Sequence, residues 1–346
     1  MPTLKLLLKF CAGALAALLA TELVLQALPV STATRMDFYV DPFIKTYPPN
    51  WQFRASSLWD LRQPVSQKTN SAGFASSVER AIALPGLALI GDSFVEGTGV
   101  AEHSRVTERL RAYAPEVDTI MLGSPGTSLL DYLDRIRWAQ KRFNVNNFVI
   151  FVEANDGNEA VCGSGQHLRR CFNPTTAKID VTEAEARNGI KNFFGNFASL
   201  QYFLGHLKLT PERLMKALIS KKPSETSEFP PFGPLRSPIS AVAIEHFLSE
   251  LSQMKSARLM LVLDCNRRAL YAGKNPADAP THAELKERNK KYNLQIVEAC
   301  PRFKERFARD GLRTEISLTD AHWNARGHDI VAQLVAEEWK KRFTAP

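Results

Sequence analysis

The stretch "LALIGDSFVEGTGV", residues 87–100, decides the fold of this chain. It opens with four consecutive apolar residues, which are typical of a strand buried on both faces. The run ends at Gly91-Asp92-Ser93, a turn sequence. Ser93 at this point is either a polar cap of the following turn or a nucleophile presented at the tip of a strand. The partners that separate these two interpretations must come from other parts of the chain.

Four more short apolar runs resemble this one. They are "VDTIMLGSPG" (117–126), "NNFVIFVEAND" (146–156), "ARLMLVLDCN" (257–266) and "TEISLTD" (314–320). Helical patterns lie between most of them, including residues 128–143 and 283–311. Alternating strands and helices predict an α/β fold with a parallel sheet covered on both faces.

Four of the five predicted strands end in polar or glycine residues. The ends are Gly91-Asp92-Ser93, Gly123-Ser124-Pro125-Gly126, Asn155-Asp156 and Asp320-Ala321-His322. Because ligands of open parallel sheets bind beyond the carboxyl ends of the strands, we expect these groups to converge. Together they supply a hydroxyl, a histidine with a nearby carboxylate, an amide and a glycine turn. Acyl transfer through serine needs this set of groups.

These blocks resemble those of the SGNH, or GDSL-like, hydrolases. Gly91-Asp92-Ser93-Phe94 with Gly97 is similar to block I, the Gly126 turn to block II, Asn155-Asp156 to block III, and "DAHWNARGH" (320–328) to block V. The resemblance covers residues 70 to 340 approximately. Upstream, "TNSAGF" (69–74) is similar to the lead-in of membrane-anchored bacterial members.

The resemblance implies a flavodoxin-like three-layer α/β/α sandwich and a set of roles. Ser93 would be the nucleophile, His322 the base and Asp320 the group that orients it. The N–H groups of Ser93 and Gly126 and the side chain of Asn155 would form the oxyanion hole. No metal and no cofactor are expected.

Two positions depart from the family pattern. Met121 stands where block II usually has asparagine, and Glu153 stands where block III usually has glycine. A carboxylate that faced the oxyanion hole would oppose the negative charge that develops there.

The N-terminus predicts a membrane anchor. Lys5 and Lys9 precede an uncharged run, and the apolar stretch from Leu6 to Val30 is long enough to span a bilayer. No small-x-small cleavage site follows, which favours an uncleaved anchor over a cleaved signal peptide. The positions of the lysines place the N-terminus in the cytoplasm. We therefore expect a single-pass protein of a bacterial inner membrane, with its main domain on the periplasmic or extracytoplasmic side.

The cysteines agree with export. Cys162 and Cys171 bracket a short polar loop that a disulfide can close, and Cys265 and Cys300 form a second candidate pair. The alternative is four free thiols. A metal site is disfavoured because no ligand-spaced histidine accompanies them.

The expected organisation is an anchor over residues 1–30, an extended lead-in over 31–80 and an SGNH-like catalytic domain over 81–346. The lead-in is rich in proline, serine and asparagine. The catalytic domain carries an insertion at about 158–236, which either forms a lid or substrate wall or embellishes the surface.

Composition narrows the function. The 346 residues carry a net charge of +8 without an aromatic-interleaved basic stripe, which argues against nucleic-acid binding. No Gly-Lys-Ser/Thr follows Gly97 and Gly99, which argues against a phosphate loop.

The leading hypothesis is an exported, membrane-tethered serine esterase or O-acyltransferase that acts through an acyl-serine intermediate. Its expected substrates are O-acyl groups, foremost O-acetyl groups, of envelope or secreted glycans, and its expected partners include the envelope polysaccharide machinery. The alternatives are a catalytically silent glycan-binding or scaffold protein of the envelope and a lipid-directed esterase.

Overall fold

The structure is a computed structural model. It describes residues 2–32, 38–79, 84–164, 169–183, 193–207, 209, 235, 237–274, 276, 278–318 and 320–343.

A five-stranded parallel sheet forms the centre of the molecule. Its strands are β5 (Gly86–Gly91), β6 (Asp118–Gly123), β7 (Asn147–Val152), β10 (Arg258–Leu263) and β11 (Gln295–Glu298). They lie in the order β11-β10-β7-β5-β6, and all neighbouring pairs are parallel. Numbered along the chain, this is the 2-1-3-4-5 order of flavodoxin-like folds. The order changes direction between β5 and β7, where ligands of such sheets bind.

The fifth strand of the sheet is not the one that the sequence predicted. Residues 314–320 were expected in the sheet, but β12 (Glu315–Ser317) pairs antiparallel with β13 (Asp320–Trp323) in a separate ribbon. The edge strand β11 instead interrupts the helix predicted over 283–311. Asn293, at φ 51°, ends α11 (Pro280–Tyr292), and α12 (Cys300–Asp310) starts at Cys300, with Pro301 in its first turn. A left-handed residue stops a helix, so the short β-prone run between these two signals forms a strand.

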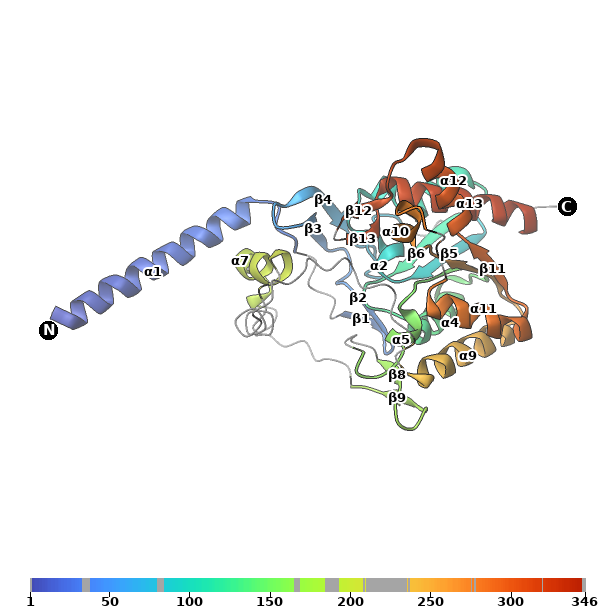
Figure 1. Cartoon of the computed structure of the whole chain (residues 1–346). Helices are drawn as coiled ribbons and strands as arrows, with labels where there is room; N and C mark the ends of the chain where they lie inside the picture. The colour runs from blue at the N-terminus through green and yellow to red at the C-terminus, as the bar shows by residue number, and fades with distance from the viewer. Residues whose placement is uncertain are drawn as a thin grey trace.

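Helices cover both faces of the sheet, which confirms the predicted three-layer sandwich (Figure 1). One face packs against α4 (Leu129–Phe143), α9 (Pro238–Gln253) and α11. The other packs against α3 (Val106–Tyr113), α12 and α13 (Ala325–Phe343).

The remaining elements are short. They are β1 (Phe38–Asp41), β2 (Ile44–Thr46), β3 (Gln52–Ser57), β4 (Arg62–Lys68), α2 (Ser93–Glu96), η1 (Glu102–Ser104), α5 (Asp156–Glu159), β8 (Arg170–Phe172), β9 (Ile179–Val181), α7 (Ala198–Gln201), the π-helical turn η2 (Tyr202–His206) and α10 (Arg267–Tyr271). Within the expected lead-in, β1–β2 and β3–β4 form two antiparallel hairpins. Much of the insertion, including residues 210–234, lies outside the described residues.

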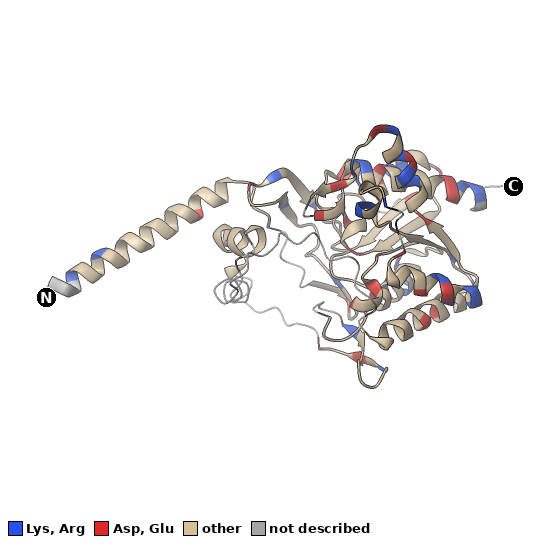
Figure 2. Cartoon of the chain, viewed as in Figure 1, with Lys and Arg blue, Asp and Glu red and all other residues tan. Residues whose placement is uncertain are grey.

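The N-terminal helix α1 (Pro2–Ala27) stands away from the sandwich (Figure 1). Within the described part of the chain, its Lys5–Ala27 segment is long and apolar enough to cross a membrane or to act as a signal sequence. Its charged residues lie near its start and at Glu22 (Figure 2). Most of its side chains are exposed in the structure.

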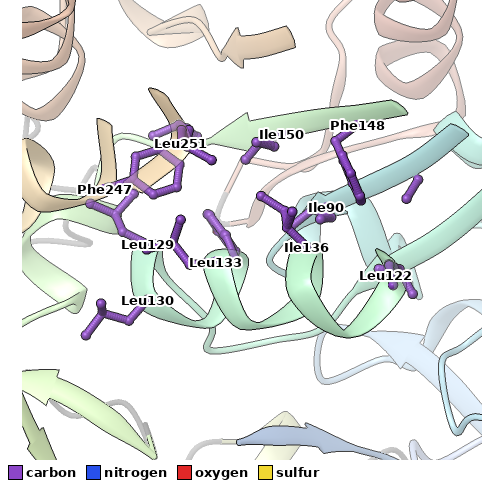
Figure 3. Packing of buried hydrophobic residues seen from close by; sticks show 14 of the residues in the cluster. Ile90, Leu122, Leu129, Leu130, Leu133, Ile136, Phe148, Ile150, Phe247 and Leu251 are labelled. Carbon is purple, nitrogen blue, oxygen red and sulfur yellow. The ribbon is translucent and has the colours of Figure 1, made fainter. Parts of the chain in front are cut away.

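The strands are continuous apolar runs in the sequence because both of their faces are buried in the core. Side chains alternate across β5: Ala88 and Ile90 face α4, while Leu87 and Leu89 face α3 and α13. Figure 3 shows the α4 side, where Leu133 and Ile136 of the helix point toward the sheet. Burial of each such side chain stabilises the folded state by about 1.5–3 kcal/mol relative to leaving it exposed.

Both predicted cysteine pairs are disulfide-bonded in the structure. Cys162 is joined to Cys171, and Cys265 to Cys300. The second bond ties the segment after β10 to the start of α12, next to the carboxyl edge of the sheet. Disulfides of this kind persist in oxidising compartments, which agrees with a location outside the cytoplasm.

Candidate active site

Ser93 begins the short helix α2 directly after β5, at the carboxyl edge of the sheet. The side chain of Asp92 caps the helix by accepting a hydrogen bond from the Phe94 N–H (2.9 Å). Gly97 ends the helix at φ 61°. A Cβ at this glycine would lie 2.8 Å from Cε1 of His328, so both the backbone angle and the close packing require glycine here. The turn sequence therefore fixes the position of the serine.

Ser93, His322 and Asp320 form a hydrogen-bonded chain. The distance from Ser93 Oγ to His322 Nε2 is 2.7 Å, and that from His322 Nδ1 to Asp320 Oδ1 is 2.6 Å. The same Oδ1 accepts the backbone N–H of His322 (3.0 Å). The structure thus brings Ser93 into contact with His322, which lies 229 positions later in the sequence, at the spacing that a nucleophile and its base require.

Arg267 supports the strand that carries the histidine. Its buried guanidinium pairs with Asp264 (3.0 Å) and Glu315 (3.4 Å) and donates to the carbonyl of Ala321. It also lies over the ring of Phe94, which in turn packs against the imidazole of His322 with 4.7 Å between ring centroids. One arginine therefore connects both sides of the Ser93–His322 contact. No local sequence signal predicts this role, because Arg267 reaches β13 only in the folded chain.

The pKa of His322 lies above its ordinary value. Burial lowers it, but the hydrogen bond and charge of Asp320, with the charges of Asp92 and Glu96, outweigh burial. The side chain of His322 is 41% exposed because it lines a surface pocket: protein atoms surround the ring, and its remaining surface faces the pocket. A base with a raised pKa is stronger, and it needs a pH above that pKa to be neutral.

The predicted oxyanion donors follow the strands next to Ser93. Gly126, at φ 67°, lies in the turn after β6, where Ser124 N and Thr127 Oγ1 both donate to the carbonyl of Gly91 (3.3 Å each). This ties the glycine turn to the end of the strand that carries Ser93. Asn155 follows β7 and is exposed, and its Nδ2 donates to Glu159 Oε1 (2.5 Å). That bond engages one of the two amide hydrogens of Asn155.

Glu153 does not line the pocket that contains Ser93. Its carboxyl group is buried and lines a separate pocket beside Asp264 and His282, beyond β7 and β10. Burial, with Asp264, Asp92 and Asp156 nearby, raises its pKa well above the ordinary value, so the side chain favours the neutral form. Because of its position and its neutral form, Glu153 does not place a negative charge against the predicted oxyanion hole.

Asp156 and Met121 have structural contacts. Asp156 is fully buried, and its Oδ2 accepts the N–H of Glu153 (2.8 Å) and the hydroxyl of Tyr132 (3.1 Å). Met121 is buried in β6, and its sulfur accepts the N–H of Gly123 (3.2 Å). Both residues therefore contribute to the shape of the strand ends.

The pocket in front of Ser93 has a volume of about 290 Å³. Besides Ser93, Asp320 and His322, its wall includes Ser31, Tyr47 and Glu96. The lead-in and the residues directly after α1 therefore form part of the candidate site, a contribution that sequence reasoning missed.

Glu96 is a buried acid at this pocket. It is 1% exposed, its Oε1 has no hydrogen-bond partner in the described part of the chain, and its Oε2 accepts the hydroxyl of Thr98 (3.3 Å). Burial raises the pKa of Glu96 to about 7. Among the described residues, no cluster of histidine, cysteine and acidic side chains can hold a metal ion.

No protein-family model and no curated protein matches this chain. Among solved structures, it is similar to a member of the lipolytic G-D-S-L family from Veillonella parvula DSM 2008 (13% identity, TM-score 0.38, 75% of this chain and 99% of the other). The chain is also similar to a two-domain esterase active on acetylated mannans (13% identity, TM-score 0.41, 76% of this chain and 50% of the other). A third is an acetylxylan esterase from Geobacillus stearothermophilus in a catalytic mutant (13%, 0.38, 73% and 93%). At these identities and TM-scores, none of the similarities assigns a function to this chain.

Proposed function

We propose that this protein is an SGNH-type serine esterase. The observation that carries the proposal is the hydrogen-bonded chain from Ser93 Oγ through both ring nitrogens of His322 to Asp320, at 2.7 and 2.6 Å. A serine hydroxyl is a weak nucleophile at neutral pH, and an imidazole within hydrogen-bond reach activates it. The carboxylate keeps the proton on Nδ1 and stabilises the imidazolium that forms.

The reaction proceeds in two steps. Ser93 Oγ attacks the ester carbonyl while its proton passes to His322 Nε2, and the carbonyl oxygen becomes an oxyanion held by the N–H groups of Ser93 and Gly126 and by Asn155. The intermediate expels the alcohol, which takes the proton from His322, and an acyl-Ser93 ester remains. Water then gives a proton to His322 and attacks this ester; as the acid is released, His322 returns that proton to Ser93 Oγ. Each donor to the oxyanion is worth about 3–4 kcal/mol of barrier.

A sugar hydroxyl in place of water would make the same site an O-acyltransferase. We propose small O-acyl groups such as acetyl on envelope or secreted glycans as substrates, because a pocket of about 290 Å³ leaves limited room for an acyl chain. The SGNH-like unit would span residues 81–346, and the lead-in over 31–80 would complete the wall of its pocket.

We further propose that α1 is retained as a membrane anchor on the extracytoplasmic domain. The end of the helix is integrated into the fold: Arg54 donates to the carbonyl of Gln26 (3.2 Å), and Ser56 Oγ donates to that of Pro29 (2.6 Å). Cleavage near residue 30 would remove these contacts and the chain next to the catalytic pocket.

The test is a fluorophosphonate probe on the purified full-length protein, followed by mass spectrometry. We expect labelling of Ser93, hydrolysis of an aryl acetate, and loss of both in Ser93→Ala. Ser249→Ala, on α9, serves as the matched control and should retain both. Absence of any acyl or phosphonyl adduct on Ser93 would overturn the proposal in favour of a binding or scaffold protein.

A further inference from the structure

We propose that five exposed apolar side chains next to α1 form a second membrane contact, which lies in the lipid–water interface of the bilayer that α1 crosses. This aromatic surface consists of Trp59, Phe193, Phe194, Phe203 and Leu204, which are 66%, 60%, 50%, 41% and 43% exposed. The inference rests on the proposed role of α1 as an anchor. It adds a contact that determines how the catalytic pocket is held over the membrane.

The aromatic surface is attached to the end of the anchor by hydrogen bonds to Glu22. Glu22 of α1 accepts the N–H groups of Ala198 (2.8 Å) and Ser199 (3.0 Å) at the start of α7. It also accepts the hydroxyl of Ser199 (2.6 Å). Leu25 and Ala198 pack together in a small apolar cluster beside these bonds. The two elements therefore keep a fixed relation to each other.

A histidine joins the same segment to the tip of the β3–β4 hairpin. His206 Nε2 accepts the N–H of Ser31 (3.1 Å), and its Nδ1–H donates to the carbonyl of Leu58 (2.9 Å). The hydroxyl of Tyr202 donates to the carbonyl of Trp59 (2.8 Å). Trp59 and the phenylalanines, which are distant in sequence, are thus carried by one connected unit.

The depth of this unit matches the interface of a bilayer. Glu22 lies five residues before Ala27, the last residue of α1, which corresponds to about 7.5 Å along the helix axis. An acidic side chain at the bilayer centre costs about 2.5–3.5 kcal/mol, so Glu22 belongs near the headgroups. The segment that it caps then lies within the polar layer of about 5–8 Å that flanks the hydrocarbon core.

Its composition matches this environment rather than water. Residues 193–207 contain no Asp, Glu, Lys or Arg, and α7 carries no charged colour in Figure 2. Tryptophan and other aromatic side chains are favoured at the membrane–water interface, and exposed apolar patches of this kind mark interaction sites. Because the patch adjoins the proposed transmembrane helix, the bilayer is the partner that necessarily lies next to it.

This contact has a consequence for the substrate. Ser31 follows the end of α1 by four residues and lines the pocket of Ser93. A second contact beside α1 would restrict tilting of the domain and keep that pocket close to the headgroups. The favoured substrate is therefore an ester presented at the membrane surface on an amphiphilic carrier.

The test measures the depth of labelled side chains in the full-length protein. In a Cys11→Ser background, Phe203→Cys or Phe194→Cys is labelled with an environment-sensitive NBD dye, without reductant, and reconstituted in phosphatidylcholine–phosphatidylglycerol nanodiscs. Leu312→Cys is the matched control, because Leu312 is 57% exposed between α12 and β12. Quenching by nitroxide-labelled lipid is then compared between sites.

We expect nitroxide lipid to quench the labels at Phe203 and Phe194 at least threefold more than the label at Leu312, with iodide in the buffer showing the reverse order. Equal quenching at the three sites would overturn the inference. The readout needs no catalysis. A protein that shows lipid quenching but labels no serine would refute the proposed esterase and leave the membrane contact supported.

Discussion

The most informative perturbation of the candidate site is Asp320→Asn. Both hydrogen bonds from His322 end on one oxygen, since Oδ1 accepts the backbone N–H at 3.0 Å and Nδ1–H at 2.6 Å. An asparagine keeps an acceptor at that position. Turning its amide over would place N–H groups against two donors, so the native orientation is retained. The imidazole should therefore keep its proton on Nδ1, and the variant loses only the negative charge.

The expected fall in kcat/KM follows from the loss of that negative charge. Two unit charges at about 4 Å interact by about 4 kcal/mol at an effective dielectric constant of 20. The side chains of His322 and Asp320 are 41% and 33% exposed, so solvent reduces this figure. A loss of about 2–3 kcal/mol in the transition state corresponds to a fall in kcat/KM of about 30- to 150-fold. An amide that imposed the wrong tautomer would cost about 10⁴-fold.

The assay is the pH dependence of kcat/KM on an aryl acetate. His322 acts as a base when neutral, so activity is lost as pH falls through its pKa, which in the native protein lies above 6.5. Without the charge of Asp320, burial dominates, and the acid limb should move to lower pH. Asp320→Ala, which also loses the orientation, should be slower than Asp320→Asn. A loss of 10⁴-fold in Asp320→Asn, or an unmoved acid limb, would refute this reasoning.

Three further predictions concern stability. The pKa of Glu153 is raised in the folded state, so its contribution to the free energy of unfolding is fully present below the pKa of the unfolded chain. As pH rises from there to the folded pKa, this contribution falls by about 1.4 kcal/mol per pH unit. The urea midpoint should therefore rise as pH falls from 8 to 5, and Glu153→Gln should make this rise smaller. Gly97→Ala should cost about 1–3 kcal/mol of unfolding free energy, because it places a Cβ against His328 at positive φ, and an unchanged melting temperature would contradict this. Replacing Cys265 and Cys300 by serine opens a loop of 35 residues and should cost about 4 kcal/mol, measured by denaturant unfolding under non-reducing conditions.

Local signals were sufficient where an element is specified by its own residues. Four strands of the sheet were predicted because each is a short apolar run ended by turn residues. The strand β11 was missed because its run of four residues lies between two helices, and the break depends on Asn293 adopting a left-handed conformation. Within the strand predicted over 314–320, Glu315–Ser317 is indeed extended, but its pairing with β13 rather than with the sheet is a property of the fold.

The three residues of the proposed triad were predicted because order along the chain and position at strand ends are visible in sequence. The contributions of Arg267 and Glu96 were not, since each depends on contacts across the fold. Arg267 reaches the carbonyl of Ala321, 54 residues away. Glu96 looks like an ordinary residue of a helical turn, and only the packing of Tyr47 and Arg105 around it makes it a buried acid.

Glu153 shows why a motif position alone does not define a role. Backbone geometry after β7 is fixed by Asp156, which accepts the N–H of Glu153 itself. The side chain at position 153 is then directed into the space beside Asp264, where it is 4% exposed and three other acids are close. Protonating the Glu153 side chain there costs less free energy than burying its charged form, so the residue is tolerated as a neutral carboxylic acid. The oxyanion region after β5 and β6 is left without a fixed negative charge from this position, and the departure from the family pattern is compatible with catalysis.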